Sequence, residues 1–311
     1  MKFLHIGLSA TGLPLNGLQK ALMKLGEYIE IDTATPNINQ VIRQKSDSFR
    51  PDLVWIQVQT DGVLGIDTMQ YLRKNGAFVI NWTGDVRSPI PYFYEGLGKE
   101  IDLTCFSNMT DVELLSAKGV KCDFHHIGYD PEIYTPKGNK ITAPEIVFLG
   151  NNFGKAFPLS GYRADMVKYL QSTYREEFGV YGNGWSKSNG TFMGNQMGEA
   201  SLYRSCKIAI NCSHFEYKRY SSDRMLRIMG SGAFCLTKWY PGLDEDFNPG
   251  IDCVQWHDFD ELKYLIDYYL DEKNENQRQA IAEKGQINVS TNLTFDKMAQ
   301  SIYQLYLKYK I

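Results

Sequence analysis

The residues best suited to chemistry lie in a polar loop between an apolar segment and a short helical pattern. The loop covers 213–222; the preceding segment, 207–212, is typical of a buried strand, and 223–229 is typical of a helix ended by glycines. The loop therefore joins the carboxyl end of a strand to the N-terminus of a helix. In open α/β sheets anionic ligands bind at this place, because free N–H groups and the helix dipole favour negative charge.

Charged and hydroxyl side chains in this segment strengthen the prediction of an anion site. Lys218, Arg219 and Arg224 supply positive charge, and a guanidinium can hold phosphate through two parallel hydrogen bonds. Ser221 or Ser222 can cap the helix. The segment predicts a phosphate or nucleotide-diphosphate site. The alternative is an ordinary helix whose arginines are solvated or paired with acids.

A second polar loop directly follows the apolar strand pattern at 146–149. Its glycines would let the backbone approach a ligand closely, and its polar side chains would contact that ligand. The residues concerned are Gly150, Asn151, Asn152 and Lys155. The loop is not a Walker loop, because the terminal Gly-Lys-Ser/Thr is missing.

A third loop follows the strand pattern at 178–181. Gly182 and Asn183 are candidates for accommodating the edge of a base, with Trp185 as a wall of the pocket. A plain structural turn explains these residues equally well.

One carboxylate in the first half of the chain is a candidate catalytic group. Asp85 follows the apolar strand pattern at 77–80, and a carboxylate at the carboxyl end of a strand projects toward the ligand edge of a sheet. It could accept a proton from a sugar or alcohol hydroxyl. Arg87 could instead pair with Asp85 and make it a structural anchor of the loop.

Two adjacent histidines, His125 and His126, also lie at a predicted strand end. Either could act in acid–base chemistry or hold a diphosphate. Adjacent residues of a strand point to opposite faces, so at most one can reach the ligand edge. We take His126 as the candidate.

These residues must be positioned by a chain in which strand and helix patterns alternate. In the first half, strands are expected at 2–7, 28–33, 53–58, 77–82, 103–107 and 121–125, with helices at 18–25, 38–44, 66–74 and 111–118. Alternation with short connections predicts a parallel sheet with right-handed crossovers. The turn-rich segment 129–140 predicts the boundary of a first domain, 1–137.

Composition limits the classes of function. The 311 residues carry a net charge of −3, which argues against a general attraction to nucleic acid. The six cysteines form no C-x-x-C pair and are typical of buried thiols in a reducing compartment. No apolar run approaches membrane-spanning length, and we expect a cytoplasmic protein without a membrane span. Asp244-Glu-Asp246 has the Asp-x-Asp look of a metal–diphosphate motif.

From about residue 145 to 295 the order of these pieces resembles the C-terminal half of a GT-B glycosyltransferase, closest to the spore-maturation-protein-like, or glycosyl transferase family 1-like, group. The matching pieces are 145–154, a helix carrying Arg163, 180–185, 201–213, 223–237, 241–256, 259–270 and 294–306. One position departs from the group: the residue three after Arg224, usually a glutamate taken to hold the ribose, is Arg227.

The resemblance implies a fold and an activity. The fold would be two Rossmann-like parallel-sheet domains facing a cleft: an acceptor-side domain at 1–137, a nucleotide-sugar domain at 138–293 and a terminal helix at 294–311 that crosses back. The loop with Gly242, Leu243, Asp244 and Glu245 would hold the donor sugar, without a metal. The first glycine loop would face the acceptor, with Gly12 beside it, although Gly12 and Gly17 could simply shape a turn.

The sequence therefore predicts transfer of a sugar from a nucleotide-diphosphate sugar, most simply a UDP-sugar, to a hydroxyl, with no other cofactor. Asp85 would accept the proton, and Lys218, Arg224 and the amides near Ser221 and Ser222 would stabilise the departing diphosphate. The acceptor could be a polysaccharide, a small molecule or a modified nucleic-acid base. A sugar-nucleotide epimerase and a catalytically silent binding protein of the same fold remain alternatives.

Overall fold

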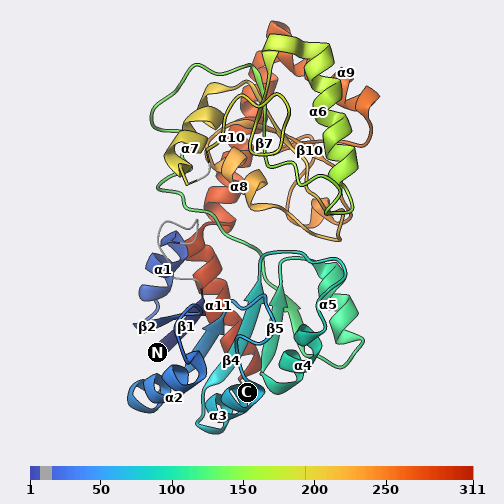
Figure 1. The fold of residues 1–311 in the computed structure, drawn as a ribbon. Helices are drawn as coiled ribbons and strands as arrows, with labels where there is room; N and C mark the ends of the chain where they lie inside the picture. Colours follow the sequence, from blue (N-terminus) through green and yellow to red (C-terminus); the bar gives the residue numbers. More distant parts are fainter. Residues whose placement is uncertain (8–15, 193, 311) are drawn as a thin grey trace. The chain divides into compact units, whose positions relative to one another are not determined.

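The computed structural model describes residues 1–7, 16–192 and 194–310, and these form two compact units (Figure 1). The first unit consists of Met1–Gly128 and Phe295–Ile311, and the second of Tyr129–Thr294. Each unit is built on one parallel sheet. The alternating strand and helix patterns of the sequence are thus those of two α/β domains.

The first unit contains a six-stranded parallel sheet in the order β2-β1-β3-β4-β5-β6. Its strands are β1 (Lys2–Gly7), β2 (Glu27–Asp32), β3 (Leu53–Ile56), β4 (Phe78–Thr83), β5 (Leu103–Phe106) and β6 (Cys122–Phe124). Its helices are α1 (Asn16–Met23), α2 (Ile38–Phe49), α3 (Ile66–Lys74), α4 (Phe93–Glu100), α5 (Met109–Ser116) and α11 (Phe295–Tyr309).

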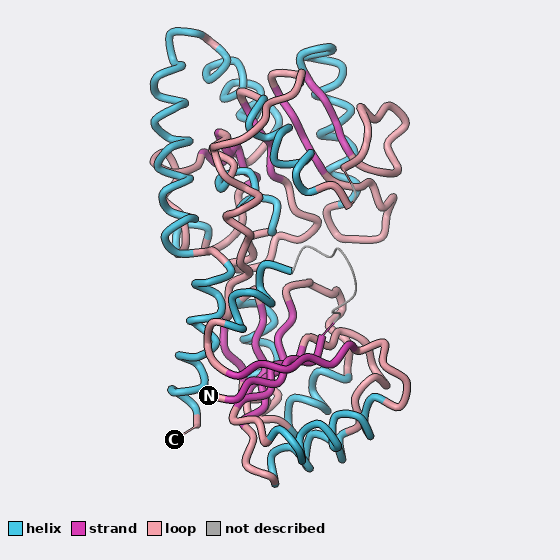
Figure 2. Tube along the Cα trace, turned by 90° about the vertical axis from the view of Figure 1, so that its left-hand side faces the viewer, coloured by secondary structure: helices cyan, strands magenta, loops and turns pink. Residues whose placement is uncertain are grey.

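Side chains that alternate along the strands build a core on each face of this sheet. Phe3 packs with α1 and α11, whereas Leu4 and Ile6 pack with α2 and α3 on the opposite face. Figure 2 shows helices on both sides of these strands. Coverage on both faces explains why the strands are almost continuously apolar in the sequence.

The second unit contains a five-stranded parallel sheet in the order β11-β10-β9-β7-β8. Its strands are β7 (Ile146–Leu149), β8 (Phe178–Tyr181), β9 (Ile208–Asn211), β10 (Phe234–Lys238) and β11 (Val254–Trp256). Its α-helices are α6 (Ser160–Tyr174), α7 (Gln196–Ser205), α8 (Asp223–Gly230), α9 (Phe259–Leu270) and α10 (Glu275–Asn292), and short 3-10 turns lie at Arg175–Glu177, Leu243–Glu245 and Glu272–Asn274.

The division between the units falls after Gly128, earlier than the boundary expected after residue 137. The reason is that the intervening segment packs on the second unit. The Tyr129 ring lies so close to Gly230 that a Cβ on that glycine would be 2.4 Å from the ring, and the Tyr134 hydroxyl donates to Glu199 over 3.1 Å.

Helix α11 returns to the first unit after the second is complete. Its apolar side, including Met298 and Ile302, packs on the same core as Phe3. Ion pairs of 2.8 Å at each end, Lys24 with Asp296 and Lys308 with Asp123, join it to the rest of the unit.

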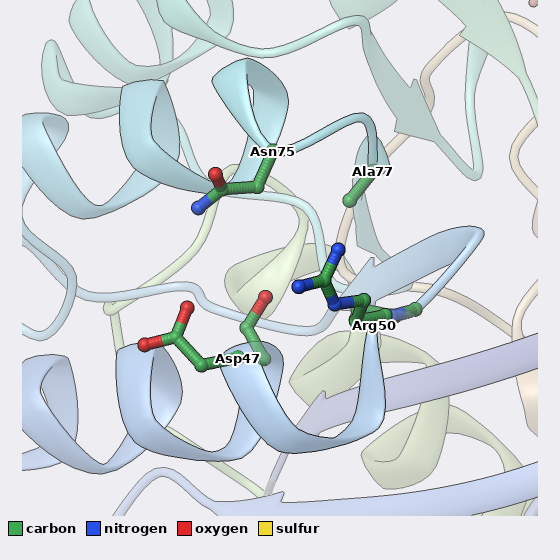
Figure 3. Close-up of a pocket in the computed structure, with 6 residues that line it drawn as sticks. Asp47, Arg50, Asn75 and Ala77 are labelled. Carbon is green, nitrogen blue, oxygen red and sulfur yellow. The ribbon is translucent and has the colours of Figure 1, made fainter.

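A small pocket of about 180 Å³ lies at the amino ends of β3 and β4, where α2 and α3 also end (Figure 3). Its lining includes Asp47, Arg50 and Asn75. Ligands of open α/β sheets bind at the carboxyl ends of the strands. The pocket therefore lies at the edge of the sheet opposite to the one at which ligands of this fold class bind. Among the described helices, none is long and apolar enough to span a bilayer.

Candidate functional site

Two arginines from different helices meet at the carboxyl edge of the second sheet. Arg163 comes from α6 and Arg224 from the first turn of α8. Both guanidinium groups lie over the ring of Phe148, near the end of β7, with Cζ 5.1 Å and 5.4 Å from the ring centroid. Two cations thus contact one aromatic ring.

Gly150 leaves room for this pair. A Cβ on that residue would lie 2.6 Å from a terminal nitrogen of Arg163 and 3.0 Å from one of Arg224. A side chain there would displace both guanidinium groups. The glycine predicted to let the backbone approach a ligand also makes space for the arginines that would bind it.

Arg163 is a buried charge for which the described residues supply no counter-ion. It is 1% exposed, and none of its three guanidinium nitrogens has a hydrogen-bond partner among the described residues. Burial, and then the charge of Arg224, lower its pKa to about 9. An unpaired buried charge is costly, and an anion at this edge would compensate it.

Arg224 is partly exposed and is oriented by the end of β9. Its Nη1 donates to Asn211 Oδ1 over 3.3 Å and to the Cys212 carbonyl over 3.2 Å. Asn211 is held in turn by Thr237, to which its amide donates over 3.0 Å. The charge therefore stands at the strand edge on a supported side chain.

The predicted serine cap of α8 is wrong. Ser222 occupies the N-cap position but makes no capping bond; its hydroxyl donates to Asn211 over 2.9 Å instead. The Ser221 hydroxyl bonds the Tyr240 hydroxyl over 2.6 Å. Both hydroxyls thus fix neighbouring residues instead of capping the helix, and in the first turn the Arg224 amide donates to the Asp223 carboxylate over 2.8 Å.

His214 borders the two arginines. Its ring packs on Phe153 and Phe157, with centroids 5.4 Å and 4.8 Å away, and its Nδ1 lies 3.2 Å from the Ser160 hydroxyl. Burial first, and then the arginine charges, lower the pKa of His214 to about 3. The imidazole is neutral near pH 7 and adds no charge.

The loops after β7 and β8 are bound to each other. Asn151 accepts from the Asn183 amide over 2.9 Å, and a Cβ on Gly182 would lie 2.6 Å from the Gly150 carbonyl. That carbonyl also accepts from the Trp185 indole over 2.7 Å. Trp185 therefore stabilises the loop at Gly150, which packs against the two arginines.

The remaining side chains of the first loop have separate environments. Asn152 accepts from the Gly154 amide over 3.0 Å and so stabilises the turn, and Lys155 is exposed.

Arg219 holds the loop predicted to bind the donor sugar. It donates to both carboxylate oxygens of Asp246 over 2.8 Å and 2.7 Å, and Glu245 lies 3.6 Å away. Lys218, its neighbour, is partly buried. Arg219 is thus engaged with two acids of this loop.

The residues of that loop differ in conformation and burial. Gly242 has a left-handed φ of 75° and turns the chain, Leu243 is buried in the core, and Asp244 is exposed. Backbone groups of the loop, and the side chains of Asp244 and Glu245, are the parts able to meet a ligand.

Asp85, the candidate base, follows β4 in the first unit. Its carboxylate is 59% exposed and lies 3.5 Å from Arg87, which also donates to Gln59 over 3.0 Å. The Thr83 hydroxyl bonds the backbone of Asp85. The carboxylate is accessible, and its contact with Arg87 is long enough to be weak.

The two histidines considered for the acceptor side differ in burial. His125 is buried against Trp55 and Trp82, whereas His126 is partly exposed, with Nδ1 2.8 Å from the Ile127 carbonyl. The Nε2 atom of His126 is itself buried. Gly12 lies outside the described residues.

Arg227 is paired with acids. It lies 2.6 Å from Asp223 and 3.5 Å from Glu199, a buried residue of α7. No group of three or more His, Cys, Asp or Glu side chains within the described residues is arranged to hold a metal ion.

Comparison with known proteins gives a family match for part of the chain. Residues 163–304 match the family described as glycosyl transferase-like. This segment includes Arg163, Arg224 and the loop at 241–246. The match shows that this segment is similar to glycosyl transferase-like proteins, and the two parallel-sheet domains give the chain the GT-B fold. No curated protein sequence matches the chain.

Solved structures share the fold over nearly the whole length. A glycosyltransferase from Rickettsia africae is 12% identical with a TM-score of 0.73, covering 99% of this chain and 98% of that one. HepE from Anabaena, solved with UDP and glucose, is 11% identical with a TM-score of 0.67, covering 99% and 100%. Sucrose-phosphate synthase from Thermosynechococcus elongatus is 10% identical with a TM-score of 0.69, covering 99% and 98%.

Proposed function

We propose that this protein transfers a glycosyl group from a UDP-sugar to a hydroxyl acceptor without a metal ion. The observation that carries the proposal is the buried guanidinium of Arg163, unpartnered among the described residues, beside Arg224. Two adjacent cations at the carboxyl edge of a parallel sheet suit a diphosphate, which carries two or more negative charges. The Anabaena structural neighbour binds UDP, which supports UDP as the nucleotide.

In this proposal the phosphate-binding set is Arg163, Arg224 and the N-terminus of α8. As the bond between the sugar and the diphosphate breaks, negative charge grows on the leaving oxygen. The two guanidinium groups stabilise that charge where a metal ion does so in other enzymes. Lys218 adds positive charge in the same loop, and Arg219 positions the loop at 241–246 through Asp246.

The other contacts of the donor are assigned by the position of each loop. Backbone groups at Gly150, Gly182 and Asn183 border the nucleotide, with Asn151 joining the two loops. Gly242, Asp244 and Glu245 border the sugar, while Leu243 anchors that loop in the core.

Asp85 is the proposed general base. It accepts the proton of the acceptor hydroxyl as the new bond from the acceptor oxygen to the sugar carbon forms. Its exposure and its long contact with Arg87 leave the carboxylate open to a hydroxyl. His126 and Arg87 are assigned to acceptor binding. The acceptor is a polysaccharide, a small molecule or a modified nucleic-acid base. Six free cysteines support a reducing compartment such as the cytoplasm.

The test is release of the corresponding nucleoside diphosphate from each of a panel of UDP-, GDP-, ADP- and dTDP-sugars, measured with and without a mixture of hydroxyl acceptors. We expect UDP-sugars to be consumed by the wild type and not by Arg224→Met. Lys168→Met is the matched control, because Lys168 is an exposed cation on the same helix as Arg163. Consumption of another nucleotide sugar in place of the UDP-sugar would contradict the proposal that the donor nucleotide is UDP. Equal rates of sugar-nucleotide consumption for wild type and Arg224→Met would contradict the assignment of Arg224 to the phosphate-binding site.

A further inference from the structure

A second group of charges lies one helical turn beyond Arg224. Arg227, whose side chain is 16% exposed, contacts Asp223 over 2.6 Å and Glu199 over 3.5 Å. Its Cζ lies 5.4 Å from the centroid of the Tyr134 ring, and the hydroxyl of that tyrosine donates to the same oxygen of Glu199. The guanidinium therefore joins α8 to α7 through Glu199 and pairs with Asp223 in the first turn of its own helix.

These carboxylates lie close to the proposed phosphate site. Asp223 is the residue before Arg224, and its Oδ1 accepts the Arg224 amide over 2.8 Å. Glu199 is 5% exposed, and its Oε1 has no hydrogen-bond partner among the described residues. Negative charge so near the site opposes the binding of a diphosphate.

Arg227 remains charged in this environment. Burial alone would lower its pKa, but Asp223 and Glu199 hold the pKa above the ordinary value for arginine. One positive charge is thus shared by two negative ones. Removing it would leave a buried, uncompensated Glu199 and an unpaired Asp223 beside Arg224.

We propose that Arg227 is a positioning residue of the nucleotide site, which acts by neutralising Glu199 and Asp223 and by fixing the first turn of α8. It does not touch the ligand; it preserves the positive potential that Arg163 and Arg224 supply. This inference rests on the proposed function of that site.

The experiment is calorimetric titration of UDP into folded wild type, Arg227→Met, Arg227→Lys, Glu199→Gln and the double variant Arg227→Met with Glu199→Gln. Methionine keeps the length of the side chain but removes its charge. We expect about tenfold weaker binding for Arg227→Met, near-wild-type binding for Arg227→Lys, and recovery of most of the loss in the double variant. Recovery would show that the acid is what Arg227 controls.

Arg204→Met separates this effect from general destabilisation. Arg204 is a buried arginine of α7 that bonds the Asn139 and Thr135 carbonyls and the Ser201 hydroxyl. Loss of the Arg204 side chain should lower the melting temperature of the protein without weakening its binding of UDP. Wild-type UDP affinity in Arg227→Met, or no recovery in the double variant, would overturn the inference. Weaker binding in Glu199→Gln alone would also overturn it, because Glu199 would then contact the ligand.

Inorganic pyrophosphate is titrated into the same variants so that the two proposals can fail separately. If the wild type binds pyrophosphate but not UDP, the assignment of UDP fails while the Arg227 series still tests the charge effect. If the wild type binds neither, the anion site and the inference about Arg227 fall together.

Discussion

The guanidinium groups of Arg163 and Arg224, 61 positions apart in the sequence, both lie over the ring of Phe148. Of the two side chains, only that of Arg224 has hydrogen-bond partners among the described residues. Stability and binding therefore make opposite demands on this pair. Without a ligand, the buried Arg163 charge lowers the stability of the fold. With an anion bound, it becomes part of the attraction.

The first prediction concerns Arg163→Met. Because the variant removes an uncompensated buried charge and keeps an unbranched side chain on Phe148, it should raise the free energy of unfolding of the unliganded protein by about 1 kcal/mol or more. It should also lose stabilisation by UDP. Urea denaturation with and without UDP checks both results. Lower stability together with undiminished UDP stabilisation would contradict this reading of Arg163.

The second prediction concerns Gly150→Ala. The added Cβ would meet both guanidinium groups, so UDP affinity should fall by about tenfold or more while the fold persists. Gly161→Ala is the control, since a Cβ there meets no atom within 4 Å and the residue lies on the same helix as Arg163. Titration of UDP into both variants distinguishes them; equal affinities would argue that the arginines do not need this space.

The third prediction concerns Asp85→Asn, which removes the proposed proton acceptor and keeps the shape. Once an acceptor is found, the transfer rate should fall by about 10²-fold to 10⁴-fold while UDP affinity is unchanged. Rate and affinity are measured on the same preparation. A rate within a few-fold of wild type would remove Asp85 from the mechanism.

The fourth prediction concerns acid stability. Burial is the main cause that lowers the pKa of His5 to about 4 and that of His125 to about 3. Below pH 6.5 the unfolded chain therefore binds protons that the folded chain excludes, and stability falls as the pH falls. Each group should cost about 2 kcal/mol between pH 7 and pH 5.

Urea denaturation of wild type and His125→Phe at these two pH values measures this loss. The variant should lose about 2 kcal/mol less stability over the interval than wild type. An unchanged pH dependence in His125→Phe would show that His125 is not buried as a neutral group.

The sequence was most informative where local pattern and burial agree. Buried parallel strands are short apolar runs, so β1, β7 and β9 lie within a residue or two of their predicted positions. Helices α4 and α10 were not predicted. Helix α4 contains Gly96 and Gly98, and α10 is polar on most sides, since its buried stripe includes Arg278 and Gly285.

The candidate site was only partly predictable for a related reason. Arg224 stands out because a loop, a helix start and neighbouring cations surround it in the sequence. Arg163 lies in the middle of a helix, and its significance comes from Phe148, Gly150 and Arg224, which tertiary structure brings to it. Similarly, the acids that pair with Arg219 and Arg227 come partly from other elements. Spacing along the chain carries no signal for such contacts.

The most direct test of the account is calorimetric titration of UDP and of uridine into wild type and Arg163→Met. If the paired arginines bind the diphosphate, wild type should bind UDP at least about a hundredfold more tightly than uridine, and the variant should lose most of that difference. Equal affinity of the wild type for UDP and uridine, or an undiminished preference for UDP in the variant, would contradict the central claim.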